Sequence, residues 1–277
     1  MLSKLIVWPV LLIVWIRSGL AMLTLFWIQK PPPIRFDFRQ KQWQHCLLGG
    51  CFLCIHWYTY FKAVDLSGVT IGLCTLFTFP MMTACLEPIV FKFPFKKAWL
   101  IGSFFGFLGV LVLVYDGTPS SSTHMGAVLG LVSALAYTIR NLLSKPLLKG
   151  LSAMSMMKVQ SSVCFVIYSI IFGVSSIQIT DLHHSVSQWV LMVLLGTVFT
   201  GIAHTLFVQS LTYFSASFVS IVACLQPVLG SLLGLIILGT TPQFNHIVGG
   251  SMIVGGIVLA TLYPTKRKRL ADATDTT

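Results

Sequence analysis

Long apolar segments alternate with short polar gaps along the whole chain. Each apolar segment has about 20 residues, the length that a helix needs to cross the hydrocarbon core of a bilayer. A transmembrane barrel would instead alternate apolar and polar residues at every second position. The pattern therefore predicts an all-α polytopic membrane protein. We expect nine transmembrane helices, at residues 5–28, 43–61, 67–90, 97–115, 124–143, 153–174, 187–209, 214–239 and 244–263.

The composition supports this prediction and excludes several classes of protein. Of the 277 residues, 56% are hydrophobic and 9% are charged, whereas an ordinary soluble domain is about a quarter charged. The longest polar stretches, residues 29–42, 116–124 and 175–188, are too short for a soluble catalytic domain. The net charge of +11 does not indicate a nucleic-acid partner, because most basic residues lie in short gaps between apolar segments. We expect a lipid bilayer and a small-molecule substrate as partners.

The basic residues also predict the orientation, because cytoplasmic loops carry an excess of Lys and Arg. If the C-terminal run Lys266–Arg269 lies in the cytoplasm, the nine segments place nearly all other Lys and Arg residues of the gaps on the same side. Of these gap residues, only Lys4 and Lys62 then fall outside. The sequence favours a bacterial inner-membrane protein whose basic tail, residues 265–277, is cytoplasmic.

An internal repeat divides the chain into two copies, residues 1–122 and 123–264. Glycines, prolines, histidines and serines recur at an offset of 147 or 148 residues. The matched pairs are Gly49 and Gly196, Pro80 and Pro227, Gly102 and Gly249, Gly109 and Gly256, His56 and His204, and Ser67 and Ser215. The second copy has five predicted helices and the first has four, so we expect the leading helix of the first copy to be missing or shortened. An odd number of helices per copy gives inverted repeats, as in many secondary transporters with a binding site near the midplane.

These residues resemble the EamA branch of the drug/metabolite transporter (DMT) superfamily. The resemblance lies in residues 56–63, Ser67, Pro80, 102–114, 126–145, Gln226, Pro227, Gly249 and Gly256. Arg17 matches an Arg that commonly begins the second helix of that family. The resemblance implies a secondary transporter of an amino acid, an amine, a drug-like compound or a solute resembling S-adenosylmethionine. The chain departs from the family at Phe93 and Thr240, where an acidic residue is usual.

Charged residues inside predicted helices are expensive to bury in lipid and are candidates for function. Arg17, Glu87 and Arg140 are such residues. Arg140 shares a helix face with Tyr137 and Asn141, and an Arg there can hold a substrate carboxylate through two hydrogen bonds. Two alternatives stay open: Arg140 can instead extend toward the cytoplasmic headgroups, and Glu87 can lie at the membrane interface.

His56 and His204 occupy equivalent positions in the two copies. A His pair suits proton coupling, because its ordinary pKa is near neutrality. A His in a membrane helix more often forms a hydrogen bond between helices, and we favour that interpretation.

Aromatic rings and amides near the histidines suit a substrate that carries a ring or an amine, although aromatic residues can equally form an interfacial belt. Prolines within a span break backbone hydrogen bonds and can offer a free carbonyl to a substrate. These further site candidates are Trp57, Tyr60, Gln209, Gln226, Pro80 and Pro227.

Two other patterns carry weaker predictions. The glycine-rich stretches 102–109 and 249–256 let helices approach closely, either within the bundle or between the protomers of a homodimer. Cys51 and Cys54 have metal-ligand spacing, but no second CxxC accompanies them, so we expect no metal site.

The chain has no nucleotide-binding loop, and we expect no cofactor. We predict a transporter rather than an enzyme. The rival classes are an integral membrane enzyme that acts on lipid-linked groups and a non-transporting membrane scaffold.

Overall fold

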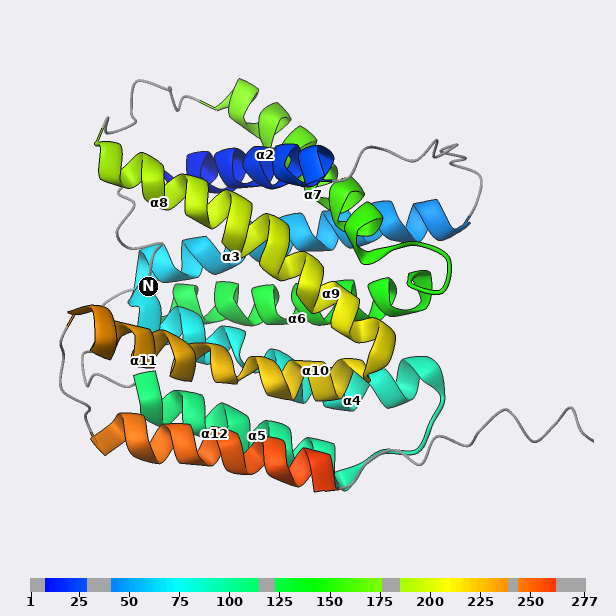
Figure 1. Ribbon diagram of the computed structural model, residues 1–277, viewed down its shortest axis with the longest axis vertical. Coiled ribbons are helices and arrows are strands. Elements are labelled where there is room, and N and C mark those ends of the chain that lie inside the picture. The colour runs from blue at the N-terminus through cyan, green and yellow to red at the C-terminus, as the bar shows by residue number, and fades with distance from the viewer. Residues whose placement is uncertain (1–7, 29–40, 115–122, 176–184, 239–243, 263–277) are drawn as a thin grey trace, which may run out of the picture.

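The computed structural model describes residues 8–28, 41–114, 123–175, 185–238 and 244–262. Within these ranges the chain is helical and has no strand, as predicted for an all-α polytopic membrane protein (Figure 1). The helices are α2 (Val10–Ile28), α3 (Lys41–Leu76), α4 (Phe79–Phe91), α5 (Lys97–Val114), α6 (Thr123–Leu147), α7 (Ala153–Val174), α8 (Val186–Gly196), the π-helix η2 (Thr197–Ile202), α9 (Ala203–Tyr213), α10 (Ala216–Ala223), α11 (Leu225–Leu238) and α12 (Phe244–Leu262).

Six continuous helical stretches of the described chain are long and apolar enough to cross a membrane. The longest, residues 41–91, comprises α3 and α4. Large apolar side chains such as Ile170, Leu206 and Ile247 are exposed on the outer surface. Helices that are apolar on their outer as well as their inner faces are typical of spans surrounded by lipid.

The helical segments of the described chain are interrupted at four places. The two parts of α3 meet at Gly68, whose backbone has φ 83° and ψ 169°; a positive φ favours glycine because a Cβ would clash there. Pro80 lies in the first turn of α4 and Pro227 in the first turn of α11, each just beyond an interruption of the helix. Proline suits a first turn because no N–H is needed there. The fourth interruption is the π-helix η2 between α8 and α9.

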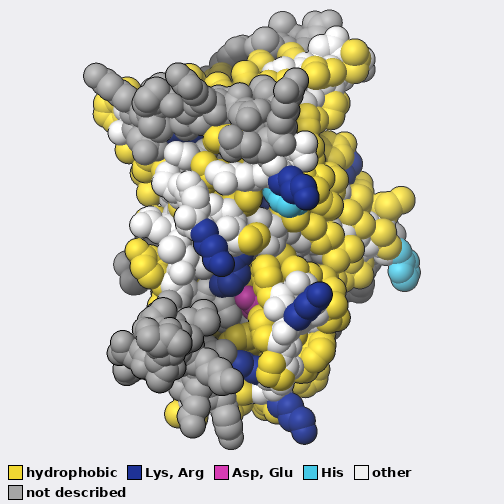
Figure 2. All heavy atoms as spheres, turned by 90° about the vertical axis from the view of Figure 1, so that its right-hand side faces the viewer, with side chains coloured by type: hydrophobic (Ala, Val, Ile, Leu, Met, Phe, Trp, Pro, Cys, Tyr) yellow, Lys and Arg dark blue, Asp and Glu magenta, His cyan; other side chains and the backbone are white. Residues whose placement is uncertain are grey.

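The helices run back and forth across the molecule, so their ends collect at two opposite faces (Figure 1). One of these faces, shown in Figure 2, gathers basic side chains around a hollow that contains an acidic side chain. The described lysines at the helix ends on this side are Lys41, Lys92, Lys96, Lys97, Lys145 and Lys149. Lys62 lies toward the opposite end. We call the first side the basic end face.

The glycine-rich stretches of α5 and α12 pack directly against each other. A Cβ added to Gly102 would lie 2.6 Å from the carbonyl oxygen of Gly256, and one added to Gly109 would lie 2.6 Å from that of Gly249. Any side chain at these positions would force the helices apart. These contacts lie within the chain; the homodimer stays a prediction.

Candidate functional site

Arg17 lies near the middle of α2 and is 6% exposed. Its Nε donates to Thr200 Oγ1 at 2.5 Å, and its Nη2 lies 3.3 Å from His204 Nε2. The guanidinium also lies over two rings of α3, 4.5 Å from the centre of Trp57 and 5.2 Å from that of Phe61. Four elements, α2, α3, η2 and α9, therefore meet at one cation. We call these five residues the Arg17 cluster.

The wide turn of η2 places Thr200 in the cluster. The Thr200 hydroxyl donates to the carbonyl oxygen of Leu195, five residues earlier, which leaves its lone pairs free to accept from Arg17. Turns of this kind are rare in α-helices and frequently occur at functional sites.

Two ring N–H donors of the Arg17 cluster have no acceptor in the described part of the chain. A guanidinium can only donate, so Nε2 of His204 accepts from Arg17, and the neutral ring then carries its proton on Nδ1. That Nδ1 and the indole Nε1 of Trp57 are both buried and have no hydrogen-bond partner among the described residues. The two rings meet edge to face with their centres 5.7 Å apart. Buried polar atoms are nearly always paired, and the described residues supply no acceptor for these two groups.

His56 and Tyr137 connect the Arg17 cluster to α6. His56 Nδ1 lies 2.8 Å from Ser133 Oγ, and that hydroxyl donates to the His56 carbonyl oxygen at 3.0 Å. The ring of Tyr137 stacks on His56 with centres 4.4 Å apart and meets His204 edge to face at 6.3 Å. Both histidines thus contact Tyr137, and His56 makes a hydrogen bond between helices.

Arg140 is fully buried and turns toward α7 rather than toward a membrane surface. Its Nε and Nη2 both donate to Gln160 Oε1, at 2.9 and 2.6 Å, and its Nη1 donates to Asn141 Oδ1 at 3.1 Å. Nη2 also contacts the sulfur of Met157. Neighbouring side chains therefore satisfy most donors of Arg140, which distinguishes it from Arg17.

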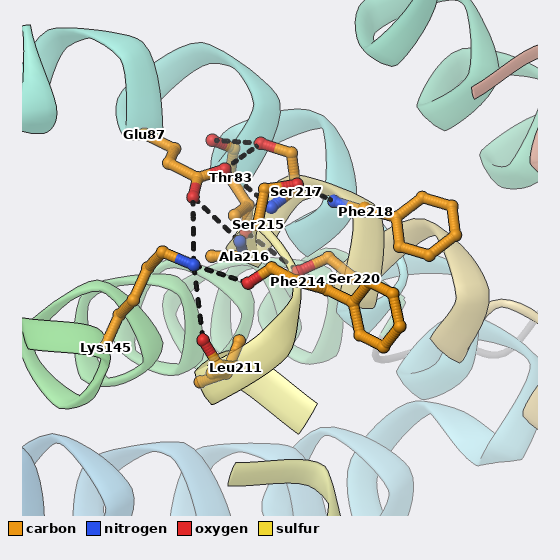
Figure 3. A network of polar contacts seen from close by, with 10 residues as sticks. All are labelled: Thr83, Glu87, Lys145, Leu211, Phe214, Ser215, Ala216, Ser217, Phe218 and Ser220. Carbon is orange, nitrogen blue, oxygen red and sulfur yellow. Dashed lines mark hydrogen bonds and ion pairs between the residues drawn. The ribbon is translucent and has the colours of Figure 1, made fainter. Parts of the chain in front are cut away.

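Glu87 belongs to a separate buried network near the basic end face (Figure 3). It is 1% exposed, and its carboxylate accepts from the backbone N–H groups of Ala216 and Ser217 at 2.7 and 2.8 Å and from Ser217 Oγ at 2.6 Å. Lys145 Nζ lies 3.9 Å from the carboxylate and donates to the carbonyl oxygen of Phe214 at 2.5 Å. Glu87 thus caps the N-terminus of α10, and Lys145 holds the end of α9. We call these residues the Glu87 cluster.

The remaining sequence candidates lie at the edge of this arrangement or outside it. Tyr60 stacks beside His56 at 6.3 Å. Gln209 lines a pocket of about 500 Å³ at the basic end face, and Gln226 is exposed, so neither belongs to the buried cluster. The pocket is lined by Ile28, Leu148, Leu151, Ser152, Ala153, Met154, Thr205, Gln209, Thr212 and Tyr213.

Comparison with known proteins identifies the family. The model of the EamA-like transporter family matches residues 1–115 and 124–262. The chain belongs to the EamA-like transporter family. It is therefore a membrane transporter by family, as predicted.

Two curated relatives of this EamA-like transporter come from Bacillus subtilis (strain 168). The uncharacterized transporter YxxF is 28% identical over 233 residues, which cover 80% of this chain and 73% of YxxF. The uncharacterized transporter YwfM is 24% identical over 262 residues, which cover 91% of this chain and 83% of YwfM. A crystal structure of another protein has the same fold, with a TM-score of 0.71 at 17% identity over 92% of this chain and 88% of that one.

Two polar contacts of the EamA-like transporter were missed from the sequence. Gln160 is an amide inside an apolar segment, so the rule that selected Arg140 could also have selected its partner. Thr200 gave no signal, because its role depends on the π-turn that aims its hydroxyl at Arg17.

Proposed function

We propose that this EamA-like protein is a secondary transporter that moves small organic metabolites across a bacterial inner membrane by alternating access. The substrate site lies in the middle of the bundle, between two inverted halves that rock against each other. Such sites are usual in transporters built from inverted repeats.

The observation that carries this proposal is a buried polar site to which both predicted halves contribute. Arg17 and Trp57 precede the boundary between the two repeats, whereas Tyr137, Thr200 and His204 follow it. All five lie within helices, and Arg17, Trp57 and Thr200 are almost completely buried. Polar groups at such a depth are costly unless they serve a function, and a site shared by two halves changes when the halves move.

The contact between α5 and α12 supports the inverted arrangement. Under the offset of 147 residues, Gly102 corresponds to Gly249 and Gly109 to Gly256. In space, Gly102 lies against Gly256 and Gly109 against Gly249. This exchange of partners is what a two-fold axis between equivalent helices produces.

The orientation is part of the proposal, with the basic end face and the C-terminus in the cytoplasm. A reporter that is active only in the cytoplasm, fused after Thr277, should be active. Activity of a reporter that works only in the periplasm would overturn this orientation.

Counterflow in proteoliposomes tests the transport proposal. Liposomes loaded with an unlabelled metabolite mixture should accumulate one labelled solute in a saturable way, with amino acids, amines, organic acids and S-adenosylmethionine offered in turn. Liposomes without the protein are the control. Folded, inserted protein that accumulates no label from the whole panel would contradict the proposal, and assays for a lipid-modifying enzyme would then follow.

A further inference from the structure

We infer that the Arg17 cluster binds the carboxylate of the substrate, so that the transported solutes are organic anions with an apolar or aromatic body. This inference rests on the proposed transport function and deepens it by naming a substrate class. It also moves the predicted carboxylate contact from Arg140 to Arg17.

The first argument is the number of unused donors. A guanidinium has five N–H donors, and the hydrogen bonds of Arg17 to described residues use one on Nε and one on Nη2. Trp57 Nε1 and His204 Nδ1 are further donors without acceptors among the described residues. All these unused groups are donors. A carboxylate, which offers only acceptors, complements such a set.

The second argument is charge. Arg17 and Arg140 are both buried, with exposed fractions of 6% and 0%. The two carboxylates of the described chain lie elsewhere: Glu87 caps α10, and Asp65 pairs with Lys62 at 2.7 Å on the surface. Buried cations without a counter-charge are costly, and a bound anion would supply the missing charge. A cationic amine would add to the imbalance.

The third argument is geometry. Arg17 lies over the rings of Trp57 and Phe61, and stacking on a ring does not use the N–H groups of a guanidinium. Beyond the bonds to Thr200 and His204, two N–H groups on Nη1 and one on Nη2 remain for bidentate binding. The ring of Tyr137 lies near His204 of the cluster and near Phe207, with centres 6.3 and 5.6 Å apart. Aromatic side chains next to the anion site suit a substrate with an apolar or aromatic body.

A pocket at the basic end face lies along α9, the helix that also carries His204. The pocket of about 500 Å³ follows one face of α9, from Tyr213 through Thr212 and Gln209 to Thr205. Those eight residue steps correspond to about 12 Å along the helix. Thr205 is buried and directly follows His204 in α9, but the lining of the pocket includes no residue of the Arg17 cluster.

Equilibrium binding to the purified full chain in detergent tests the inference. The probes are phenylacetate, its neutral amide phenylacetamide, and the cation phenethylamine. We expect phenylacetate to bind the unaltered protein at least about ten-fold more tightly than the amide, since charge-assisted bonds are worth about 1.5–3 kcal/mol, and phenethylamine to bind most weakly.

Substitutions test whether Arg17 causes the preference for phenylacetate over phenylacetamide. Arg17→Gln should reduce the ratio between phenylacetate and phenylacetamide to about one, and Arg17→Lys should retain part of it because the charge stays while the fork is lost. Lys62→Gln, which removes an exposed cation at the opposite end, is the matched control and should keep the full ratio. If Arg17→Gln does not fold, the ratio between phenylacetate and phenylacetamide binding is measured in Arg17→Lys and Trp57→Phe instead.

Each of four results would overturn the inference. These are equal binding of the acid and the amide, tighter binding of the amine, no binding of any probe, and an acid-to-amide ratio that is unchanged in the Arg17 variants. Counterflow separates this failure from failure of the proposed function. Transport of an amine without any preference for acids would contradict the anion site but not the transport function. Arg17-dependent binding of phenylacetate without counterflow of any solute would contradict the transport function but not the anion site.

Discussion

The two buried polar clusters of this protein differ in how completely they are satisfied. In the Glu87 cluster, a carboxylate receives two backbone N–H groups and a hydroxyl, and an ammonium group lies 3.9 Å away (Figure 3). In the Arg17 cluster, a cation contacts a hydroxyl, an imidazole and two rings, but no acid among the described residues.

This difference indicates that the two clusters have different roles, one in stability and one in ligand binding. A satisfied buried network stabilises the fold, and removing one member leaves the others unpaired. A network with unused donors and uncompensated charge contributes less to the fold and is complete only with a ligand. The Glu87 cluster therefore joins helices, whereas the Arg17 cluster is the site that we propose for the substrate.

The largest effect on stability is expected at Glu87. Glu87→Ala leaves the first N–H groups of α10 without their acceptors and Lys145 without its counter-ion. Breaking a buried pair in this way costs about 3–5 kcal/mol, so the free energy of unfolding, measured by SDS titration in mixed micelles, should fall by that amount. Cys85→Ser, at an exposed position of α4, should change it little. A loss as small as that of the control would show that the cluster does not hold the fold.

Arg17→Met should have the opposite effect on stability. Replacing even a buried ion pair by apolar side chains of similar volume is often neutral or stabilising by about 1–4 kcal/mol, and Arg17 has no acidic partner among the described residues. The variant should therefore unfold at an equal or higher SDS concentration while losing counterflow activity. A loss of stability comparable to that of Glu87→Ala would instead make Arg17 a structural residue.

A smaller effect is expected at Thr200, which holds Arg17 in place. Thr200→Val removes the acceptor of Arg17 Nε and should weaken phenylacetate binding by about five-fold, the equivalent of one hydrogen bond of about 1 kcal/mol. Thr197→Val is the matched control, because its hydroxyl bonds only the Val193 carbonyl of its own helical stretch. Equal affinities of the two variants would remove Thr200 from the site.

The smallest effect is expected for an ion pair on the surface. Lys62 and Asp65 have side chains that are 36% and 50% exposed, and exposed pairs contribute about 0–1 kcal/mol. Lys62→Gln should leave both stability and binding nearly unchanged in the two assays above. A clear loss of either would mean that burial is a poor guide to the importance of charges in this protein.

Much of the helical architecture could be predicted from the sequence. Apolar segments of membrane length predicted helices close to those observed, and Pro80 and Pro227 predicted two of the interruptions, because both signals are local. The interruptions at Gly68 and η2 were not predicted. The charged residues inside helices could be selected as candidates for the same reason.

The partners of these residues could not be predicted. Glu87 and the N-terminus of α10 are 129 residues apart in the chain, and Arg17 and Thr200 are 183 apart. Their contacts depend on which helix faces which, and a single sequence does not specify this. For the same reason the satisfied Arg140 and the unsatisfied Arg17 looked alike as sequence candidates.

The most direct test of the Arg17 site is a crystal structure of the full chain with 4-bromophenylacetate, located by anomalous scattering from bromine. The account predicts a bromine peak near the rings of Trp57, Phe61 or Tyr137, with the carboxylate about 3 Å from N–H groups of Arg17. A ligand that is bound in the pocket beside Gln209 without reaching Arg17, or bound only on the lipid-facing surface, would contradict it.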